Sequence, residues 1–305
     1  MIITIPIKNH KDIGTPSDSV VVLGYFDGIH KGHQELFRVA NKAARKDLLP
    51  IVVMTFNESP KIALEPYHPD LFLHILNPAE RERKLKREGV EELYLLDFSS
   101  QFASLTAEEF FATYIKAMNA KIIVAGFDYT FGSDKKTAED LKDYFDGEVI
   151  IVLPVEDEKG KISSTRIRQA ILDGNVKEAG ELLGVPLPSR GMVVHGNARG
   201  RTIGYPTANL VLLDRTYMPA DGVYVVDVEI QRQKYRAMAS VGKNVTFDGE
   251  EARFEVNIFD FNQDIYGETV MVYWLDRIRD MTKFDSVDQL VDQLKADEEV
   301  ARNWS

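Results

Sequence analysis

The sequence predicts an α/β domain with a doubly wound parallel sheet, followed by an antiparallel β-barrel domain that ends in a helix. Three observations predict this arrangement. The 305-residue chain exceeds the usual size of one domain. Apolar runs alternate with helical patterns up to about residue 184, and segments rich in β-branched and aromatic residues follow. Two prolines in Val185–Pro188 interrupt both patterns, so we expect domains at 1–184 and 189–305 joined by a linker at 185–188.

Five apolar runs in the first half have the length and the Val/Ile content of buried parallel strands. They are VVVLG (20–24), PIVVMTF (50–56), ELYLLDF (92–98), AKIIVAG (120–126) and EVIIVLP (148–154). Helical patterns separate them, at HQELFRVANKAARK (33–46), PAERERKLKREG (78–89), TAEEFFATYIKAM (106–118) and TAEDLKDYF (137–145). Two of these helices begin with the spacing of a capping pair: Thr106 with Glu109, and Thr137 with Asp140. The alternation predicts a parallel sheet with helices on both faces.

The second half contains segments typical of antiparallel strands, separated by turn signals. They are GVYVVDVEI (222–230), KYRAMASVG (234–242), ARFEVNIFDF (252–261) and ETVMVYWLDRI (268–278). This pattern predicts an antiparallel barrel or sandwich. One helical pattern, SVDQLVDQLKADEEVAR (286–302), closes the chain, with its apolar residues on one face: Val287, Leu290, Val291 and Leu294.

Composition excludes several kinds of site. A formal net charge of −11 argues against a general binder of nucleic-acid backbones. The chain has no cysteine, so disulfides, thiolate nucleophiles and Cys-ligated zinc are excluded. Residues 1–14 lack the long apolar run of a signal peptide, and no segment approaches the roughly 20 apolar residues of a membrane helix. We therefore expect a cytoplasmic protein, and no obligate protein partner is indicated.

The stretch GYFDGIHKGHQ (24–34) follows the first predicted strand and leads into a helix. In doubly wound sheets, ligands bind beyond the carboxyl ends of the strands. Gly24 and Gly28 permit close backbone approach, and the start of the helix offers unpaired N–H groups that suit phosphate. His30 and His33 add donors for a phosphorus centre that develops charge. A tight loop with two surface histidines and a metal site are the competing interpretations.

A second predicted helix start lies late in the same half, in ISSTRIRQAILDG (162–174). Either Ser163 or Ser164 can cap this helix, which places Thr165, Arg166 and Arg168 in its first turn. Hydroxyls and arginines at a helix start form an anion site. Considered alone, the stretch is more often a plain helix cap.

Together, GYFDGIHKGH and ISSTRIR resemble the nucleotidyltransferases with HxGH motifs, and GxFDGxHxGH is similar to their bacterial FAD synthetase branch. The resemblance implies a Rossmann-like domain in which His30 and His33 stabilise adenylyl transfer. It implies ATP binding by Gly24, Phe26, Asp27, Gly28, His30, His33, Ser164, Thr165 and Arg168. GFDYTFG (126–132) matches the segment that faces FMN, with Asp128 where some members have Asn. FNESP (56–60) departs from the usual Phe-x-Pro-His-Pro, since Ser59 replaces a histidine.

The barrel half opens with VVHGNARGRTIGYPTANL (193–210), which is too rich in glycine for an efficient strand or helix. Thr207 and Asn209 offer oxygens that point the same way in an extended segment, and hard oxygen ligands suit Mg²⁺. Amides around Gly200 to Gly204 could form an anion nest. A long barrel loop without a ligand is the competing interpretation.

A carboxylate near the reacting hydroxyl is the remaining requirement for phosphoryl transfer to an alcohol. Glu255 in FEVNIFDF is the candidate, because apolar Phe254 and Val256 beside it indicate a strand. Alternation places Glu255, Asn257 and Phe259 on one face of that strand. A solvated strand glutamate is the competing interpretation.

The order of GRxxGxPTAN, GVY (222–224), FEVNIFDF, DIYG (264–267) and RDMTKF (279–284) resembles riboflavin kinases. The resemblance implies that Thr207 and Asn209 help to coordinate Mg-ATP and that Glu255 is the general base on the riboflavin 5′-hydroxyl. It further implies ATP contacts by Gly200, Arg201, Gly204 and Pro206, and a flavin-side position for Arg279 and Phe284. EVN replaces the commoner Glu-x-His, and GKNVTF (242–247) lacks the usual proline before Thr-Phe.

Both resemblances cover nearly the whole chain, in the order of the bifunctional bacterial riboflavin kinase/FAD synthetase family. They imply that riboflavin and ATP give FMN in the second half, and that FMN and a second ATP give FAD and pyrophosphate in the first half, with Mg²⁺ at both centres. Two alternatives stay open. One is a nucleotidyltransferase for another phosphorylated substrate with the barrel as a specificity domain, and the other is a flavin-binding regulator or carrier.

Overall fold

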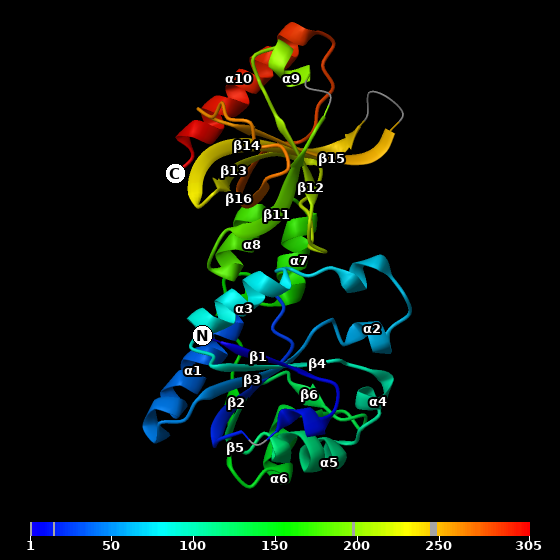
Figure 1. Cartoon of the computed structure of the whole chain (residues 1–305), viewed down its shortest axis with the longest axis vertical. Helices are drawn as coiled ribbons and strands as arrows, with labels where there is room; N and C mark the ends of the chain where they lie inside the picture. Colours follow the sequence, from blue (N-terminus) through cyan, green and yellow to red (C-terminus); the bar gives the residue numbers. More distant parts are fainter. Residues whose placement is uncertain (1, 15, 197–198, 245–248) are drawn as a thin grey trace. The chain divides into compact units, whose positions relative to one another are not determined.

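The computed structural model describes residues 2–14, 16–196, 199–244 and 249–305. The chain divides into two compact units, Met1–Ser163 and Ser164–Ser305 (Figure 1). Among the described residues, no helix is both long enough and apolar enough to cross a membrane.

The first unit is built on a six-stranded sheet in the order β1-β4-β3-β2-β5-β8. Its strands are β1 (Ile3–Ile7), β2 (Ser19–Leu23), β3 (Ile51–Phe56), β4 (Glu92–Leu96), β5 (Ala120–Gly126) and β8 (Glu148–Val152). All neighbouring strands are parallel. The predicted doubly wound parallel sheet is therefore confirmed, and each of the five predicted strands is present.

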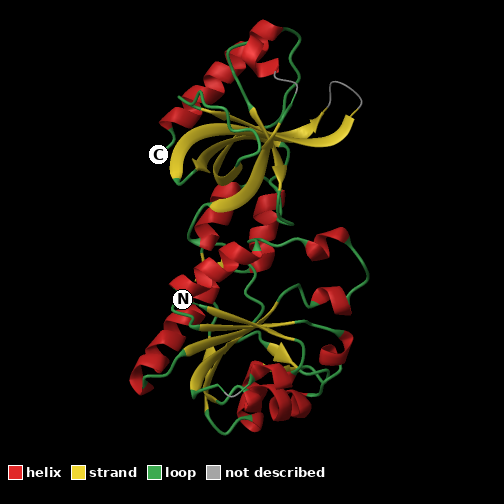
Figure 2. Ribbon diagram, viewed as in Figure 1, coloured by secondary structure: helices red, strands yellow, loops and turns green. Residues whose placement is uncertain are grey.

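Helices pack on both faces of this sheet, as Figure 2 shows in red against yellow. α1 (Lys31–Asp47) and α3 (Pro78–Arg87) share one core with Val20 and Val22 of β2. α5 (Ala107–Phe110) and a π-helical turn at Phe111–Ile115 share the other core with Val21 and Leu23. Successive strand residues point to opposite faces, so one apolar run serves both cores.

Short elements complete the first unit. The one-turn helices are α2 (Lys61–Leu64), α4 (Ser100–Ala103) and α6 (Leu141–Tyr144), and 3-10 turns lie at His10–Ile13, Pro69–Phe72 and Ala138–Asp140. Two small ribbons pair β6 (Thr130–Phe131) with β7 (Lys136–Thr137) and β9 (Glu156–Asp157) with β10 (Gly160–Lys161). Both predicted capping boxes are present, at Thr106 and Thr137.

The second unit contains a closed antiparallel barrel in the order β11-β12-β15-β14-β13-β16. Its strands are β11 (Leu187–Val194), β12 (Ala208–Leu212), β13 (Gly222–Ile230), β14 (Gln233–Asn244), β15 (Gly249–Ile258) and β16 (Thr269–Arg279). Closure by pairing of β11 with β16 decides between the two predicted alternatives in favour of a barrel. The predicted final helix is α10 (Val287–Asn303), capped by Ser286.

Two further helices belong to the second unit by packing. These are α7 (Ser164–Leu172) and α8 (Val176–Leu183), and α8 packs against β11 and β16. The Ala220 amide also donates to the Ile171 carbonyl of α7 at 3.3 Å. β11 begins at Leu187, within the segment expected as a linker. The boundaries of the functional domains stay a prediction.

Candidate active sites

The carboxyl edge of the parallel sheet brings two predicted motifs together. Chain connections run one way from β2 through β3 to β4 and the other way from β5 to β8, so the order reverses between β2 and β5. Leu23 at the end of β2 pairs with Ala125 in β5. The turn that starts at Gly24 and the segment that starts at Gly126 therefore leave the sheet side by side. Doubly wound sheets bind ligands at this position.

The turn after β2 has an uncommon backbone conformation. Phe26 and Ile29 adopt left-handed φ angles of 55° and 47°, and both side chains are buried. A β-branched residue is rarely found in this region, so the surrounding structure must hold the turn. Gly28 has a φ of 90°, and a Cβ at Gly24 would lie 2.8 Å from the Phe26 ring. Glycine is required at both positions.

Buried hydrogen bonds connect this turn to neighbouring segments. Thr55 Oγ1 in β3 donates to the Tyr25 carbonyl at 2.7 Å. The Ile75 amide donates to Asp27 Oδ1 at 2.9 Å, and Asp27 is buried. Asp27, which the resemblance implies for ATP binding, thus also fixes the turn to the segment that precedes α3.

Two buried polar residues beside the turn were missed in the sequence. The Lys84 ammonium of α3 donates to the Gly28 carbonyl at 3.3 Å. His74 Nδ1 lies 3.3 Å from the Tyr25 hydroxyl, and His74 Nε2 lies 3.2 Å from Glu58 Oε2. The exposed fractions of Lys84 and His74 are 8% and 4%. Lys84 stands in the charged run KLKRE, where nothing distinguishes it from a surface residue. His74 stands in the apolar run LFLHIL (71–76), which was a signal for burial that the sequence analysis did not use.

His30 is the N-cap of α1. Its Nδ1 accepts a hydrogen bond from the His33 amide at 3.3 Å, so in the neutral ring the proton lies on Nε2. The two imidazole rings stack with centroids 3.7 Å apart. A Cβ at Gly32 would lie 3.0 Å from the His30 ring and 3.4 Å from the Ile162 carbonyl. Gly32 therefore allows the ring to fold back over the start of the helix.

The electrostatic surroundings of His33 keep its ring uncharged. Burial, together with the nearby His30, Lys84 and Lys161, lowers the pKa of His33 well below its usual value. Its Nδ1 is buried and has no hydrogen-bond partner among the residues that the structure describes. His33 is therefore an uncharged ring stacked on His30 at a helix start, an arrangement that suits a phosphate group.

Asp128 lies in the segment that follows β5. Its Oδ2 is 2.5 Å from Lys161 Nζ, and the side chain is 60% exposed. The same ammonium lies 4.5 Å from the centre of the Phe127 ring. Asp128 therefore lies at the edge of the sheet that carries the histidine turn, and its carboxylate forms an ion pair with Lys161.

The barrel brings together the three residues predicted for phosphoryl transfer. Asn209 in β12 pairs directly with Glu255 in β15. Thr207 Oγ1 donates to Glu255 Oε2 at 3.4 Å, and Arg253 Nη1 lies 3.7 Å from Glu255 Oε1. The Glu255 side chain is 27% exposed, so solvent and a ligand can reach it. The strand register and the Thr207 contact therefore bring these three residues together, and their roles stay a prediction.

The glycine-rich segment before β12 forms a compact turn that begins with a one-turn helix, α9 (Arg199–Thr202). The Tyr205 amide donates to the Gly200 carbonyl at 2.8 Å, and a Cβ at Gly200 would lie only 2.0 Å from the Tyr205 carbonyl. The amides of Ile203 and Gly204, predicted for an anion nest, donate to carbonyls within the turn. The segment was predicted as a loop, but its residues 208–210 belong to strand β12, which pairs with β11 and β15. Residues 197–198 of the segment lie outside the described structure.

Oxygen donors of this site fit magnesium better than a transition metal. In the described part of the chain, no group of three or more His, Cys, Asp or Glu residues could hold a metal ion. Thr207, Asn209 and Glu255 instead offer a hydroxyl, an amide and one carboxylate. Mg²⁺ is commonly held by few protein ligands because water and substrate phosphates complete its shell.

Comparisons with known proteins match both halves of the chain. The model of the FAD synthetase family matches residues 12–166, and that of the riboflavin kinase family matches residues 183–305. A bifunctional riboflavin kinase/FMN adenylyltransferase from Listeria monocytogenes is 38% identical over 95% of this chain and 94% of its own length. The protein of the same name from Bacillus subtilis is 38% identical over 93% of this chain and 91% of its own length. The chain belongs to the riboflavin kinase/FMN adenylyltransferase family. The resemblance found in the sequence is thereby confirmed.

One solved structure carries a different description. A crystal structure described as a macrolide-efflux protein from Streptococcus pneumoniae is 98% identical, covers 100% of both chains and has a TM-score of 0.96. It has the same fold as this chain. Its description names transport, whereas the family models that match the two halves name flavin enzymes.

In this chain, the second predicted anion site starts α7 at Ser164. Thr165 is exposed and Arg168 is half-buried. Arg166 Nη2 forms an ion pair with Glu178 Oε1 at 2.8 Å, which gives Arg166 a structural role between α7 and α8. The helix belongs to the second compact unit and the histidine turn to the first. A joint ATP site made of both motifs stays a prediction.

The residues predicted for the flavin side of the kinase contact each other. Arg279 donates to Asp297 Oδ2 of α10 at 2.7 Å, and its guanidinium lies 5.7 Å from the centre of the Phe284 ring. Asp297 is 1% exposed. Arg279 therefore ties the end of β16 to the final helix.

The motif departures have local explanations where the structure describes them. Asn257, which stands in EVN, is buried and donates from Nδ2 to the Pro206 carbonyl at 2.6 Å. Ser59 of FNESP accepts from the Lys61 amide at 3.3 Å, at the start of α2. Residues 245–247 of GKNVTF lie outside the described residues.

Proposed function

We propose that this chain makes FMN and FAD in two reactions, one in each half. Riboflavin and ATP give FMN and ADP in the barrel. FMN and a second ATP give FAD and pyrophosphate in the half with the parallel sheet. The observation that carries the proposal is that each half matches its own flavin-enzyme model and has its own cluster of polar residues suited to phosphate. With ATP and riboflavin as substrates, the cytoplasm is the expected compartment.

For the kinase reaction, Glu255 is the proposed general base. Its carboxylate accepts the proton of the riboflavin 5′-hydroxyl as that oxygen attacks the γ-phosphorus of ATP, and the bond from that phosphorus to the ADP oxygen breaks. Thr207 donates to this carboxylate and so orients it, and Asn209 lies opposite it across the strand pair. Magnesium, held by Thr207 and Asn209, would neutralise charge on the phosphates. Gly200, Arg201, Gly204 and Pro206 line the ATP side, and Arg279 and Phe284 the flavin side.

For the adenylyl transfer, the histidine pair is the proposed transition-state stabiliser. A phosphate oxygen of FMN attacks the α-phosphorus of ATP, and pyrophosphate leaves. The His30 Nε2–H and the imidazole ring of His33 contact the phosphate oxygens, where charge develops. Gly24, Phe26 and Gly28 shape the turn around the nucleotide, and Asp128 faces the flavin.

The start of α7 is also proposed to bind the phosphate chain of ATP. Ser164, Thr165 and Arg168 supply hydroxyls and a guanidinium for that chain. Magnesium is expected there as well, since the negative charge of the triphosphate must be neutralised.

Separate sites predict separable losses of activity. Glu255→Gln should lower FMN formation by at least about 100-fold, because general base catalysis typically contributes that much, and should leave FAD formation from supplied FMN unchanged. His30→Ala with His33→Ala should do the reverse, by about 100-fold or more. Chromatography of the products from MgATP with riboflavin, or with FMN, measures both.

The same assay separates the alternatives. A chain that forms neither FMN nor FAD would contradict the proposal and favour a nucleotidyltransferase with another phosphorylated substrate. A tightly bound flavin without turnover would favour a carrier. Equal loss of both activities in either variant, with unchanged circular dichroism, would contradict the division of labour.

A further inference from the structure

A buried lysine beside the histidine turn has no role in the reaction described so far. Lys84 is 8% exposed, whereas lysine is among the residue types that are almost never fully buried. Its helix, α3, belongs to the same compact unit as the turn. Its ammonium donates to the carbonyl of Gly28, which lies between the left-handed residues Phe26 and Ile29. The contact is therefore made to the most constrained part of the turn.

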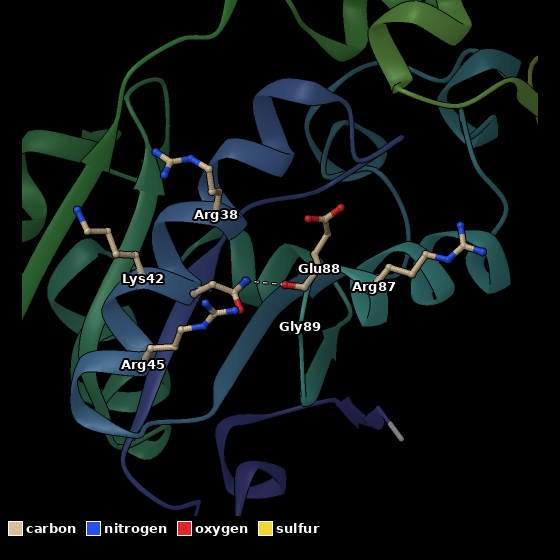
Figure 3. Close-up of a pocket in the computed structure, with 7 residues that line it drawn as sticks. Arg38, Lys42, Arg45, Arg87, Glu88 and Gly89 are labelled. Carbon is tan, nitrogen blue, oxygen red and sulfur yellow. Dashed lines mark hydrogen bonds between the residues drawn. The ribbon is translucent and has the colours of Figure 1, made fainter.

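The position of α3 relative to the histidines is fixed by a second contact. Asn41 Nδ2 of α1 donates to the Glu88 carbonyl at the end of α3 at 2.7 Å, the bond that is dashed in Figure 3. It also donates to the Phe37 carbonyl at 2.8 Å. A Cβ at Gly89, whose φ is 88°, would lie 2.8 Å from Asn41 Oδ1. Because α1 also carries His33, this contact fixes the helix of Lys84 against the helix of the histidine.

The same contact lies in a cavity of about 750 Å³ between α1 and the end of α3. Its rim carries four exposed basic side chains, which Figure 3 shows spread apart around the cavity: Arg38, Lys42, Arg45 and Arg87. Arg38 is held by Glu35 through two hydrogen bonds. The rim is thus a solvated charged surface, while α3 carries two buried cations, Arg81 and Lys84. The Arg81 guanidinium lies 6.0 Å from the centre of the Tyr25 ring, and the Lys84 ammonium is the one that donates to the Gly28 carbonyl.

We propose that Lys84 is a positioning residue for adenylyl transfer, which holds the turn through the Gly28 carbonyl and places a fixed positive charge near His33. This inference rests on the proposed function of the first half. A nearby cation disfavours a second positive charge on the histidine pair. The rings then meet the phosphate groups as neutral hydrogen-bond donors, and the turn keeps its left-handed residues in place.

The charge state of Lys84 gives the inference a measurable signature. Burial lowers the pKa of Lys84 to about 8, against the opposing effect of Glu88 and Glu80, with Arg87 acting in the same direction as burial. From another element, His33 of α1 interacts electrostatically with Lys84, and His30 and Lys161 act on the same imidazole ring. Lys84 is therefore charged at neutral pH, and it loses its proton as the pH rises through about 8. FAD formation should decline over this range.

The test is substitution of Lys84 in the full chain. Lys84→Met should lower FAD formation from supplied FMN by at least ten-fold and remove its decline near pH 8, while riboflavin phosphorylation by the same molecules stays unchanged. Lys84→Arg keeps a charge above pH 8, so its residual activity should extend to higher pH. Lys86→Met, an exposed substitution on the same helix, is the matched control and should behave as the parent.

Stability separates a positioning role from a structural one. Burying an ammonium is costly, so Lys84→Met should unfold at the same temperature as the parent or higher. A lower melting temperature with equal loss of both activities would overturn the inference, and so would a Lys84→Met variant that keeps the parent's FAD formation and pH profile. If the parent chain itself formed no FAD from FMN, the proposed function would fail first.

Discussion

At the scale of single residues, the shape of the histidine turn depends on aromatic rings that pack directly against glycines. His30 reaches back to cap α1 only because Gly32 has no side chain beneath the ring. Phe26 occupies the space over Gly24 in the same way. Gly24 and Gly32 both stand in GYFDGIHKGHQ, so the sequence predicted a turn at this position. It could not predict that the two imidazole rings stack, because stacking depends on the cap geometry.

Gly32→Ala tests this contact. The added methyl would lie 3.0 Å from the His30 ring, so the ring must move away from its capping position. We expect FAD formation to fall by about ten-fold or more, since small displacements of catalytic groups are costly. Riboflavin phosphorylation, measured in the same preparation, should not change. Unaltered FAD formation would show that the position of the ring is not critical.

A pH effect on stability follows from the half-buried His33. Its pKa is lowered in the folded chain, so below about pH 6.5 the unfolded chain binds a proton that the folded one does not. The stability of the first unit should therefore fall as the pH drops below about 6.5. Hydrogen exchange of the β2 and α1 amides measures this. His33→Gln should flatten the pH dependence of stability. An equally steep pH dependence in that variant would show that another titrating group causes the effect.

Lys84 marks the limit of prediction at this scale. KLKRE has the composition of a solvated helix face, and three of its charged residues, Lys86, Arg87 and Glu88, retain exposed or half-exposed side chains. Which residue of such a run is buried depends on the angle at which the helix packs. That angle is set by contacts with distant segments, such as Asn41.

At the scale of elements, the periodicity of apolar residues predicted the long helices and strands but missed the edge strand β1. β1 was not predicted, because ITIPI is short and contains a proline. Proline is tolerated there since β1 pairs only with β4 and is an edge strand. In α10, Val287 was placed on the buried face but is 60% exposed, because the contact stripe passes through Leu294, Asp297 and Ala301 instead.

The buried ion pair on that stripe gives a prediction about the barrel. Asp297→Ala leaves the Arg279 guanidinium without its carboxylate, and loss of one partner of a buried pair costs about 3 kcal/mol of unfolding free energy. Both tryptophans of the chain, Trp274 and Trp304, lie in the second unit, so their fluorescence during urea unfolding reports on that unit. Asp292→Ala, an exposed change on the same helix, is the control. A loss no larger than in the control would show that the pair is not important for stability.

At the scale of the whole molecule, the order of motifs along the chain predicted both folds and the family. The predicted fold class is confirmed because alternation of strands and helices, and later of strands and turns, is a property that the sequence shows directly. The compact units could not be predicted in the same way. α7 carries a motif that resembles the nucleotidyltransferases, yet it packs within the unit of the barrel. The periodicity of apolar residues predicts a helix but not the unit against which that helix packs.

The closed barrel has a consequence for how copies of this enzyme could associate. Each of its six strands already has a partner on either side, so no free row of backbone groups is offered to a neighbouring molecule. The parallel sheet, by contrast, ends in β1 and β8. An assembly that extends the six-stranded sheet by a further strand must begin at one of those two borders, and β1 carries Pro6, which cannot donate.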